Sequence, residues 1–269
     1  MIDNKKLIVC IPSGRERCLS MLLDRLEKES CIDEIHLWEN TNNEADLEFI
    51  SQYEESTDKA KIIRIEQNIG HDLCGRVSSF YSHYYEGFDD DTVFLKIDDD
   101  VVWIEEGAIE SIVRFTINNP KYLVVFMNTI NSPFIDHLHQ RFGIYPDETI
   151  YMPWDCASVA WHDAGLAELK HMTLIENIKK KNTDIYKFKR FECGSDRVAI
   201  NLICWNHNSF SYLDIYEDEH DLTVRMPSDQ QRSTCIFGEK LAAHLSFSPQ
   251  FRNGLDENKI LYLYAEINK

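Results

Sequence analysis

Short apolar segments alternate with amphipathic segments along the first half of this 269-residue chain. The apolar segments span 5–13, 32–40, 60–68, 92–98 and 121–130, and each has the length of a strand. The segments between them, at 15–30, 44–56, 73–88 and 105–119, carry apolar residues at helical spacing. Strands that alternate with helices predict an α/β fold, in which helices flank a mostly parallel sheet.

Polar residues follow each of the first four predicted strands. They read PSGRE at 12–16, ENTNN at 39–43, QNIGHD at 67–72 and DDD at 98–100. Right-handed crossovers place the carboxyl ends of parallel strands along one edge of the sheet, where open α/β sheets bind their ligands. The four loops therefore predict one site rather than four unrelated turns.

The second half of the chain is less regular. Glycine, proline and tryptophan interrupt it in NSPF, YPDETIYMPWDC and FECGSD, which predicts an extension of the sheet with long loops. The segment RVAINLICWNHNSF, 197–210, fits either a core strand or a helix. Because no linker rich in proline, glycine or serine separates the halves, we expect one composite domain.

The formal net charge of −18 excludes nucleic acid as an expected partner. One basic run, IKKKNTDIYKFKR at 178–190, is either a solvated surface or a docking surface for an anionic acceptor or lipid headgroup. No apolar run approaches the roughly 18 residues of a membrane span, and the apolar run near the N-terminus is too short for a signal peptide. We expect a cytoplasmic protein, with peripheral association at a membrane as the alternative.

Cysteine usage agrees with a reducing compartment. The eight cysteines include no Cys-x-x-Cys pair, and several lie within apolar runs such as LIVCIP and NLICW. We expect small buried side chains rather than a disulfide framework or a structural zinc site.

The acidic triplet Asp98, Asp99 and Asp100 directly follows an apolar strand. Clustered carboxylates repel one another, and their pKa values rise unless a cation joins them. Mn²⁺ and Mg²⁺ take oxygen ligands and share their shell with phosphate. Strand alternation points Asp98 and Asp100 to one ligand and Asp99 elsewhere. The alternative is a plain acidic turn, as we expect for FDD at 88–90.

The segment FLKIDDDVVWIEEGAIESIVRF resembles the Asp-x-Asp region of GT-A fold glycosyltransferases. IPSGRERCLSMLLDRL, EQNIGHDLCGRVSSFY and GEKLAAHLSFSPQ are similar to further motifs of that family, in the expected order over nearly the whole chain. The resemblance implies metal-dependent transfer, with Mn²⁺ or Mg²⁺, of a sugar from a UDP- or GDP-sugar to a hydroxyl of a glycan or glycoconjugate. It also implies a nucleotide-sugar-binding half at 1–103 and an acceptor-binding, catalytic half at 104–269, as in polysaccharide biosynthesis.

The same resemblance assigns roles to individual residues. The implied metal ligands are Asp98, Asp100 and His244, and the implied donor-binding residues are Pro12, Ser13, Arg15, Glu39, Asn40, Asn68, Gly70, Arg76, Asp98 and Asp99. For Arg15 the alternative is a surface ion pair, and for Glu39 and Asn40 it is a helix-capping turn.

An inverting enzyme of this family uses an aspartate as the base that deprotonates the acceptor. IYEDEHDLTV offers Asp218 for this role, and MPWDCASVAW offers Asp155 as the second choice. Trp154 and Trp161 flank Asp155 and suit the apolar face of an acceptor sugar. The alternatives are a helix N-cap for Asp218 and core packing for the tryptophans. Inverting and retaining mechanisms both stay open.

Two other functions compete with glycosyl transfer. A sugar nucleotidyltransferase would carry a glycine-rich loop with a lysine after the first strand, whereas IPSGRERC has one glycine and no lysine. A non-catalytic scaffold that binds sugar or nucleotide would be expected to have lost an acidic ligand, whereas Asp98, Asp100 and His244 are all present.

Overall fold

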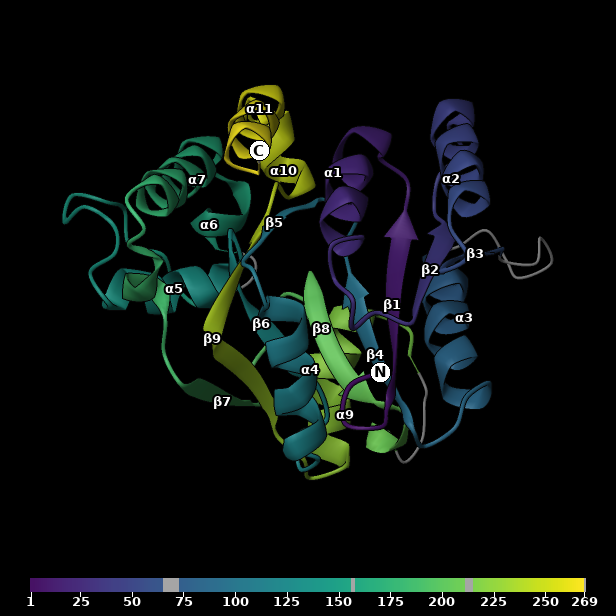
Figure 1. Ribbon diagram of the computed structural model, residues 1–269. Coiled ribbons are helices and arrows are strands. Elements are labelled where there is room, and N and C mark those ends of the chain that lie inside the picture. Colours follow the sequence, from purple (N-terminus) through teal and green to yellow (C-terminus); the bar gives the residue numbers. More distant parts are fainter. Residues whose placement is uncertain (65–72, 156–157, 211–214, 269) are drawn as a thin grey trace.

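The computed structural model describes residues 1–64, 73–155, 158–210 and 215–268, which form one nine-stranded sheet between layers of helices (Figure 1). The strands are β1 (Lys6–Ser13), β2 (Glu34–Glu39), β3 (Ala60–Ile63), β4 (Thr92–Ile97), β5 (Val101–Ile104), β6 (Val125–Ile130), β7 (Arg190–Gly194), β8 (Leu202–Asn206) and β9 (Thr234–His244).

The longer helices are α1 (Glu16–Leu26), α2 (Glu44–Ser56), α3 (Leu73–Glu86), α4 (Ala108–Asn118), α5 (Pro133–Arg141), α7 (Ala164–Lys179) and α11 (Glu257–Ile267). The shorter ones are α6 (Val159–His162), α8 (Asp218–His220), α9 (Met226–Asp229) and α10 (Ser248–Arg252), with 3₁₀ turns at Thr183–Tyr186 and His207–Ser209 and a π-helical turn at Asp221–Arg225.

The strand order is β3-β2-β1-β4-β8-β6-β9-β5, and β7 also pairs with β9. The strands β3, β2, β1 and β4 are parallel, as are β6 and β9. In contrast, β8 is antiparallel to both β4 and β6, and β5 and β7 are antiparallel to β9. The first half of the chain therefore builds a parallel sheet, and the second half extends it as a mixed sheet.

Both faces of the sheet are covered. Along β1, Leu7, Val9 and Ile11 pack on one face with the buried leucines of α1 and with apolar residues of α4. Ile8 and Cys10 pack on the other face with aromatic residues of α3 and with β8. All six residues of β4 are buried, as expected for a strand with helices on both sides.

The α/β class is confirmed, with helices on both faces of one continuous sheet. The predicted strands at 5–13, 32–40, 92–98 and 121–130 correspond to β1, β2, β4 and β6. Residues 197–210 contain β8, which decides between the strand and helix alternatives. The run of parallel neighbours that starts at β3 ends at β4, because the next strand in the sheet, β8, is antiparallel to it and comes from the less regular second half of the chain.

The cysteines whose side chains the structure describes are free thiols, and all but Cys31 are buried: Cys10, Cys18, Cys31, Cys193, Cys204 and Cys235. Within the described ranges, no helix combines the length and the apolar character that crossing a bilayer requires.

Candidate active site

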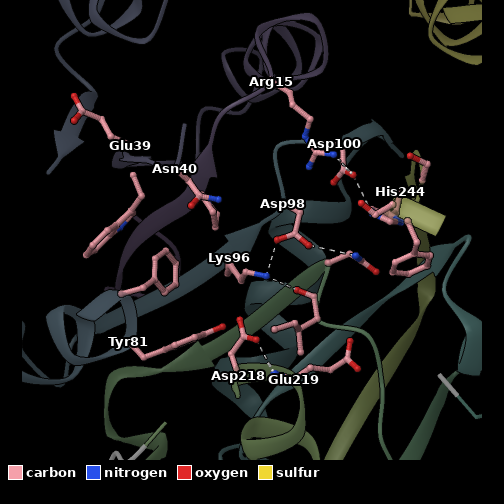
Figure 2. A pocket seen from close by; sticks show the side chains of 18 residues that line it. Arg15, Glu39, Asn40, Tyr81, Lys96, Asp98, Asp100, Asp218, Glu219 and His244 are labelled. Carbon is pink, nitrogen blue, oxygen red and sulfur yellow. Dashed lines mark hydrogen bonds and ion pairs between the residues drawn. The ribbon is translucent and has the colours of Figure 1, made fainter. Parts of the chain in front are cut away.

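A cavity of about 450 Å³ lies at the carboxyl ends of β1, β2 and β4 (Figure 2). Its lining includes Pro12, Arg15, Trp38, Glu39, Asn40, Phe80, Tyr81, Lys96, Asp98, Asp100, Asn201, Asp218, Glu219, His244 and Phe247. Loops that follow β1, β2 and β4 thus meet at one site, as the positions of the polar loops predict. The loop after β3 lies outside the described residues.

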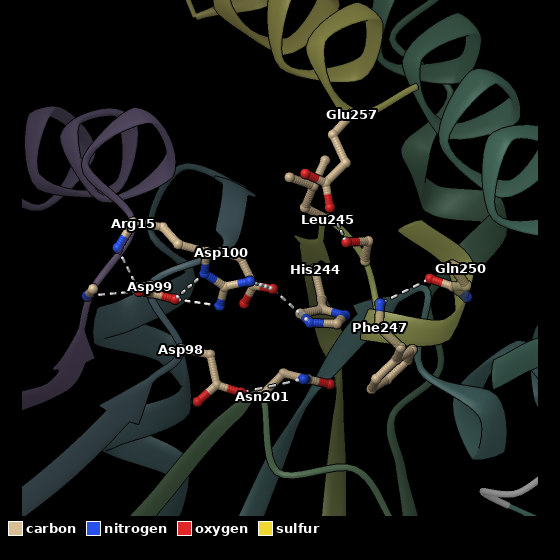
Figure 3. A network of polar contacts seen from close by, with 12 residues as sticks. Arg15, Asp98, Asp99, Asp100, Asn201, His244, Leu245, Phe247, Gln250 and Glu257 are labelled. Carbon is tan, nitrogen blue, oxygen red and sulfur yellow. Dashed lines mark hydrogen bonds and ion pairs between the residues drawn. The ribbon is translucent and has the colours of Figure 1, made fainter. Parts of the chain in front are cut away.

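Asp99 fixes the loop between β1 and α1 (Figure 3). Its Oδ2 accepts the backbone N–H groups of Gly14 at 2.8 Å and Arg15 at 3.0 Å. Its Oδ1 accepts two further hydrogen bonds from the Arg15 guanidinium, which also donates to Asp100 at 2.9 Å. Asp99 does not line the cavity. Its hydrogen bonds join the loop after β1 to the loop after β4.

Asp100 and His244 form a buried pair at the junction of β4, β5 and β9. Their side chains are 3% and 4% exposed, and His244 Nε2 lies 3.1 Å from Asp100 Oδ2. Burial alone would raise the pKa of Asp100, but His244 and Arg15 lower it to about 2. Burial opposes the charged form of His244, yet the neighbouring carboxylate raises the pKa of the imidazole. The other ring nitrogen, Nδ1, lies 3.4 Å from the backbone oxygen of Asn131.

Lys96 is a buried cation inside the cavity. Its ammonium contacts Asp98 Oδ1 at 2.6 Å and donates to the backbone oxygen of Ile200 at 2.9 Å. Figure 2 shows it between Asp98 and Asp218. Burial would lower the pKa of Lys96, but these two carboxylates raise it, so the lysine stays protonated. Asn201 donates to the other oxygen of Asp98 at 3.2 Å.

Asp218 reaches the same cavity from the start of α8. Its Oδ1 accepts the N–H of Glu219 at 2.9 Å. Burial raises the pKa of Asp218, Asp98 raises it further, and Lys96 acts in the opposite direction. The phenol oxygen of Tyr81 is buried without a hydrogen-bond partner among the described residues, and Figure 2 shows Tyr81 directed toward Asp218. A carboxylate in this setting is suited to accept a proton from a bound hydroxyl.

One carboxylate oxygen of the larger cavity is available to a cation. Asp100 Oδ1 is buried and has no hydrogen-bond partner within the described parts of the chain. Its Oδ2 is held by Arg15 and His244, and Asp98 is held by Lys96, so the described side chains form no three-ligand metal cluster. The donor types still fit Mn²⁺ or Mg²⁺, which Asp98, Asp100 and His244 would hold together with oxygens of a bound diphosphate.

The remaining predicted donor residues divide into three groups. Pro12, Glu39 and Asn40 line the cavity together with Arg15. Ser13 is buried, and its hydroxyl donates to the backbone oxygen of Ile11 at 2.9 Å, so it turns away from the cavity. Asn68, Gly70 and the side chain of Arg76 lie outside the described residues.

The two tryptophans predicted to bind the acceptor lie apart. Trp161 lines a second cavity, of about 320 Å³, which shares Asp218, Glu219 and Phe247 with the first. Trp154 is 60% exposed and contacts the ring of His137, and neither it nor Asp155 lines either of these cavities. Of the two base candidates, only Asp218 therefore lines these cavities.

Several lining residues were not assigned to the site from the sequence. Lys96 interrupts an apolar strand, a position that pattern reasoning assigns to the core. Tyr81 repeats at helical spacing with the apolar face of its helix, and Asn201 precedes a strand whose direction could not be predicted. The lysine within TVFLKI was the one available clue, because a buried lysine needs a carboxylate partner.

Comparisons with known proteins show the fold. No protein-family model matches the sequence, and neither does any curated protein. Among solved structures, a CMP:2-keto-3-deoxy-manno-octonic acid synthetase complexed with CTP matches with a TM-score of 0.50 at 10% identity, over 97% of this chain and 99% of that one. A 4-diphosphocytidyl-2C-methyl-D-erythritol synthase from Anaerococcus prevotii matches with a TM-score of 0.44 at 12% identity, over 100% and 98%.

These identities establish a similarity of fold alone. The synthetase covers nearly the whole chain, which agrees with a single Rossmann-like unit that has one central sheet.

Proposed function

We propose that this chain is a metal-dependent glycosyltransferase that uses a nucleotide-sugar donor. The observation that carries the proposal is the arrangement of the larger cavity, where Asp98, Asp100 and His244 meet Asp218. Asp98, Asp100 and His244 can hold the metal and diphosphate of a donor. Asp218 can deprotonate an acceptor. Bound Mn²⁺ or Mg²⁺ would supply Lewis-acid stabilisation of the leaving diphosphate.

The proposed glycosyl transfer exchanges one bond at the anomeric carbon for another. The acceptor oxygen forms a bond to the anomeric carbon of the sugar while the bond from that carbon to the β-phosphate oxygen breaks. The electron pair of the broken bond leaves with the nucleoside diphosphate, and the proton of the acceptor hydroxyl passes to Asp218. The raised pKa of Asp218 makes it a better proton acceptor than a fully solvated aspartate.

The charge of the cavity supports a diphosphate donor. Five carboxylates line it against Arg15 and Lys96, and both of these cations are already paired with aspartates. A triphosphate with an anionic co-substrate would bring more negative charge than a nucleotide-sugar with a neutral hydroxyl acceptor. The described residues offer few free cations to offset that charge.

The acceptor is proposed to be a glycan or glycoconjugate. The exposed lysines of the basic run at 178–190, Lys179, Lys180, Lys181 and Lys189, offer one place where an anionic surface that carries the acceptor could dock.

The second candidate is a sugar nucleotidyltransferase. It is favoured by the solved structure that matches this fold over 97% of the chain, a synthetase that was bound to CTP. The two activities release different products. A glycosyltransferase releases a nucleoside diphosphate from a nucleotide-sugar, whereas a nucleotidyltransferase releases pyrophosphate from a nucleoside triphosphate. A protein that binds nucleotide and releases neither would be the non-catalytic scaffold.

Thermal unfolding with UDP and GDP, each with and without Mn²⁺, tests the donor site. A ligand that binds the folded state raises the melting temperature by mass action. We expect a metal-dependent rise with one nucleotide that is lost in Asp100→Asn. Asp89→Asn is the matched control, because Asp89 belongs to the exposed acidic turn before β4. A rise that persists in Asp100→Asn would contradict the assigned site.

A further inference from the structure

The second cavity shares a wall with the first. It is lined by Pro133, Trp161, Arg197, Ala199, Glu217, Asp218, Glu219 and Phe247. Asp218, Glu219 and Phe247 also line the first cavity, and Figure 2 shows Asp218 and Glu219 side by side at its edge. A side chain that faces both cavities can contact both substrates of a two-substrate reaction.

Arg197 holds the two neighbours of Asp218. Its Nε donates to Glu219 at 2.6 Å, and its Nη2 donates to Glu217, also at 2.6 Å. The guanidinium therefore spans the segment that presents Asp218. With both carboxylates bound to one cation, the wall of three carboxylates and one arginine keeps a net negative charge.

An aromatic surface faces this acidic wall. The rings of Trp161 and Phe247 lie 6.2 Å apart between centroids, and Phe247 lies 4.6 Å from His244. Gln250, which is fully buried, accepts the N–H of Phe247 at 2.9 Å and donates to the backbone oxygen of Ala160 at 2.8 Å (Figure 3). One glutamine thus fixes both Phe247 and the helix that carries Trp161.

We propose that the second cavity binds the co-substrate that receives the sugar, and that it selects an uncharged sugar ring. The apolar face of the ring stacks on Trp161. Its hydroxyls donate to the carboxylates that Arg197 holds in place, and one hydroxyl reaches Asp218. An acceptor with a carboxylate beside the reactive hydroxyl is excluded, because Arg197 is already occupied and the wall is negative. The selection of an acceptor rests on the proposed function, but the binding of a neutral ring does not.

Ligand-observed NMR with saturation transfer tests the proposal on the full chain in the presence of UDP and Mn²⁺. The probes are the methyl pyranosides of glucose, galactose and mannose and the matching uronates of glucose and galactose. We expect at least one neutral pyranoside to bind and its uronate not to bind. Trp161→Ala should weaken binding about fivefold to tenfold, whereas Trp161→Phe should keep most of it.

Trp154→Ala is the matched control, because Trp154 is the exposed tryptophan that lines neither cavity. Binding of no neutral pyranoside, equal binding of the uronates, or a loss in Trp154→Ala instead of Trp161→Ala would overturn the proposal. Thermal unfolding with nucleotide separates the two claims. If no nucleotide binds but the binding of neutral pyranosides still depends on Trp161, the proposed donor function is refuted. The proposal that the second cavity binds a neutral ring is then still supported.

Discussion

The ion pair between Lys96 and Asp98 allows a quantitative test of the electrostatic interactions in the larger cavity. Removing one partner of a buried pair costs about 3–5 kcal/mol, whereas exposed pairs contribute about 0–1 kcal/mol. The Lys96 side chain is 6% exposed and that of Asp98 is 24% exposed, so this pair lies between the limits. We assign the pair a coupling of about 2 kcal/mol on this scale.

Lys96→Met should therefore lower the free energy of unfolding by about 3 kcal/mol. About 2 kcal/mol comes from the unpaired Asp98 carboxylate, and about 1 kcal/mol comes from the carbonyl of Ile200, which loses its donor. The double variant Lys96→Met/Asp98→Asn removes both charges and keeps the shape of the side chain at 98. With a coupling of about 2 kcal/mol, the double variant should be about 2 kcal/mol more stable than the sum of the two single changes predicts.

Urea unfolding in the presence of a chelator measures all four members of this cycle: the wild type, Lys96→Met, Asp98→Asn and the double variant. Equal slopes against denaturant in the four proteins are required for the comparison. If the two single changes add in the double variant, the coupling is absent and our account of the buried lysine is wrong.

Three further predictions concern other parts of the chain. Asp218→Asn should lower kcat about 10²- to 10⁴-fold and leave donor affinity unchanged in titration calorimetry. In the wild type, kcat/KM should fall as the pH falls through the raised pKa of Asp218, and a fall at the usual aspartate pKa would contradict its burial. His139 is fully buried, and burial lowers its pKa to about 3, whereas the unfolded chain protonates near 6.5. Because the unfolded state then binds more protons, His139 alone should lower stability below pH 6.5, by about 2 kcal/mol at pH 5. His171 is also fully buried with a pKa lowered to about 3, so His139→Phe should reduce the total loss by about 2 kcal/mol without abolishing it, as measured by urea unfolding at pH 5 and at pH 7. Gly238→Ala should prevent stable folding, since its Cβ would meet the ring and carbonyl of Phe188 at 2.3 Å, whereas Gly143→Ala has nothing within 4 Å and should cost only about 1 kcal/mol of backbone strain. Similar unfolding midpoints in circular dichroism for the two glycine variants would refute this prediction.

The part of the fold that contains the parallel strands β1, β2 and β4 could be predicted because local and global signals agree there. Strands β1, β2 and β4 are apolar runs that end in polar loops, and parallel connection brings those loops together. The directions of β8 and β9 could not be predicted in the same way. β9 is parallel to β6 yet antiparallel to β5, and such pairing depends on contacts between segments far apart in the chain.

The site shows the same division between local and long-range signals. Asp98 and Asp100 could be proposed because acidic residues after an apolar strand need a partner, whereas His244 was proposed from the resemblance of its segment to a GT-A motif. The role of Asp99 in binding the loop after β1 depends on hydrogen bonds across 84 and 85 positions of the chain. The different positions of Trp161 and Trp154 have a similar origin. Trp161 contacts Phe247, which lies 86 positions further along the chain, whereas Trp154 contacts His137 of the nearby helix α5.

The most direct test of the central claim is an assay of product. The wild-type protein is incubated with UDP- and GDP-hexoses, Mn²⁺ and neutral methyl pyranosides, and released nucleoside diphosphate is quantified. In parallel, nucleoside triphosphates and sugar 1-phosphates are supplied, and released pyrophosphate is quantified. We predict release of one nucleoside diphosphate by the wild type and by Asp89→Asn but not by Asp100→Asn. Release of pyrophosphate without any nucleoside diphosphate would contradict the account and establish nucleotidyl transfer instead.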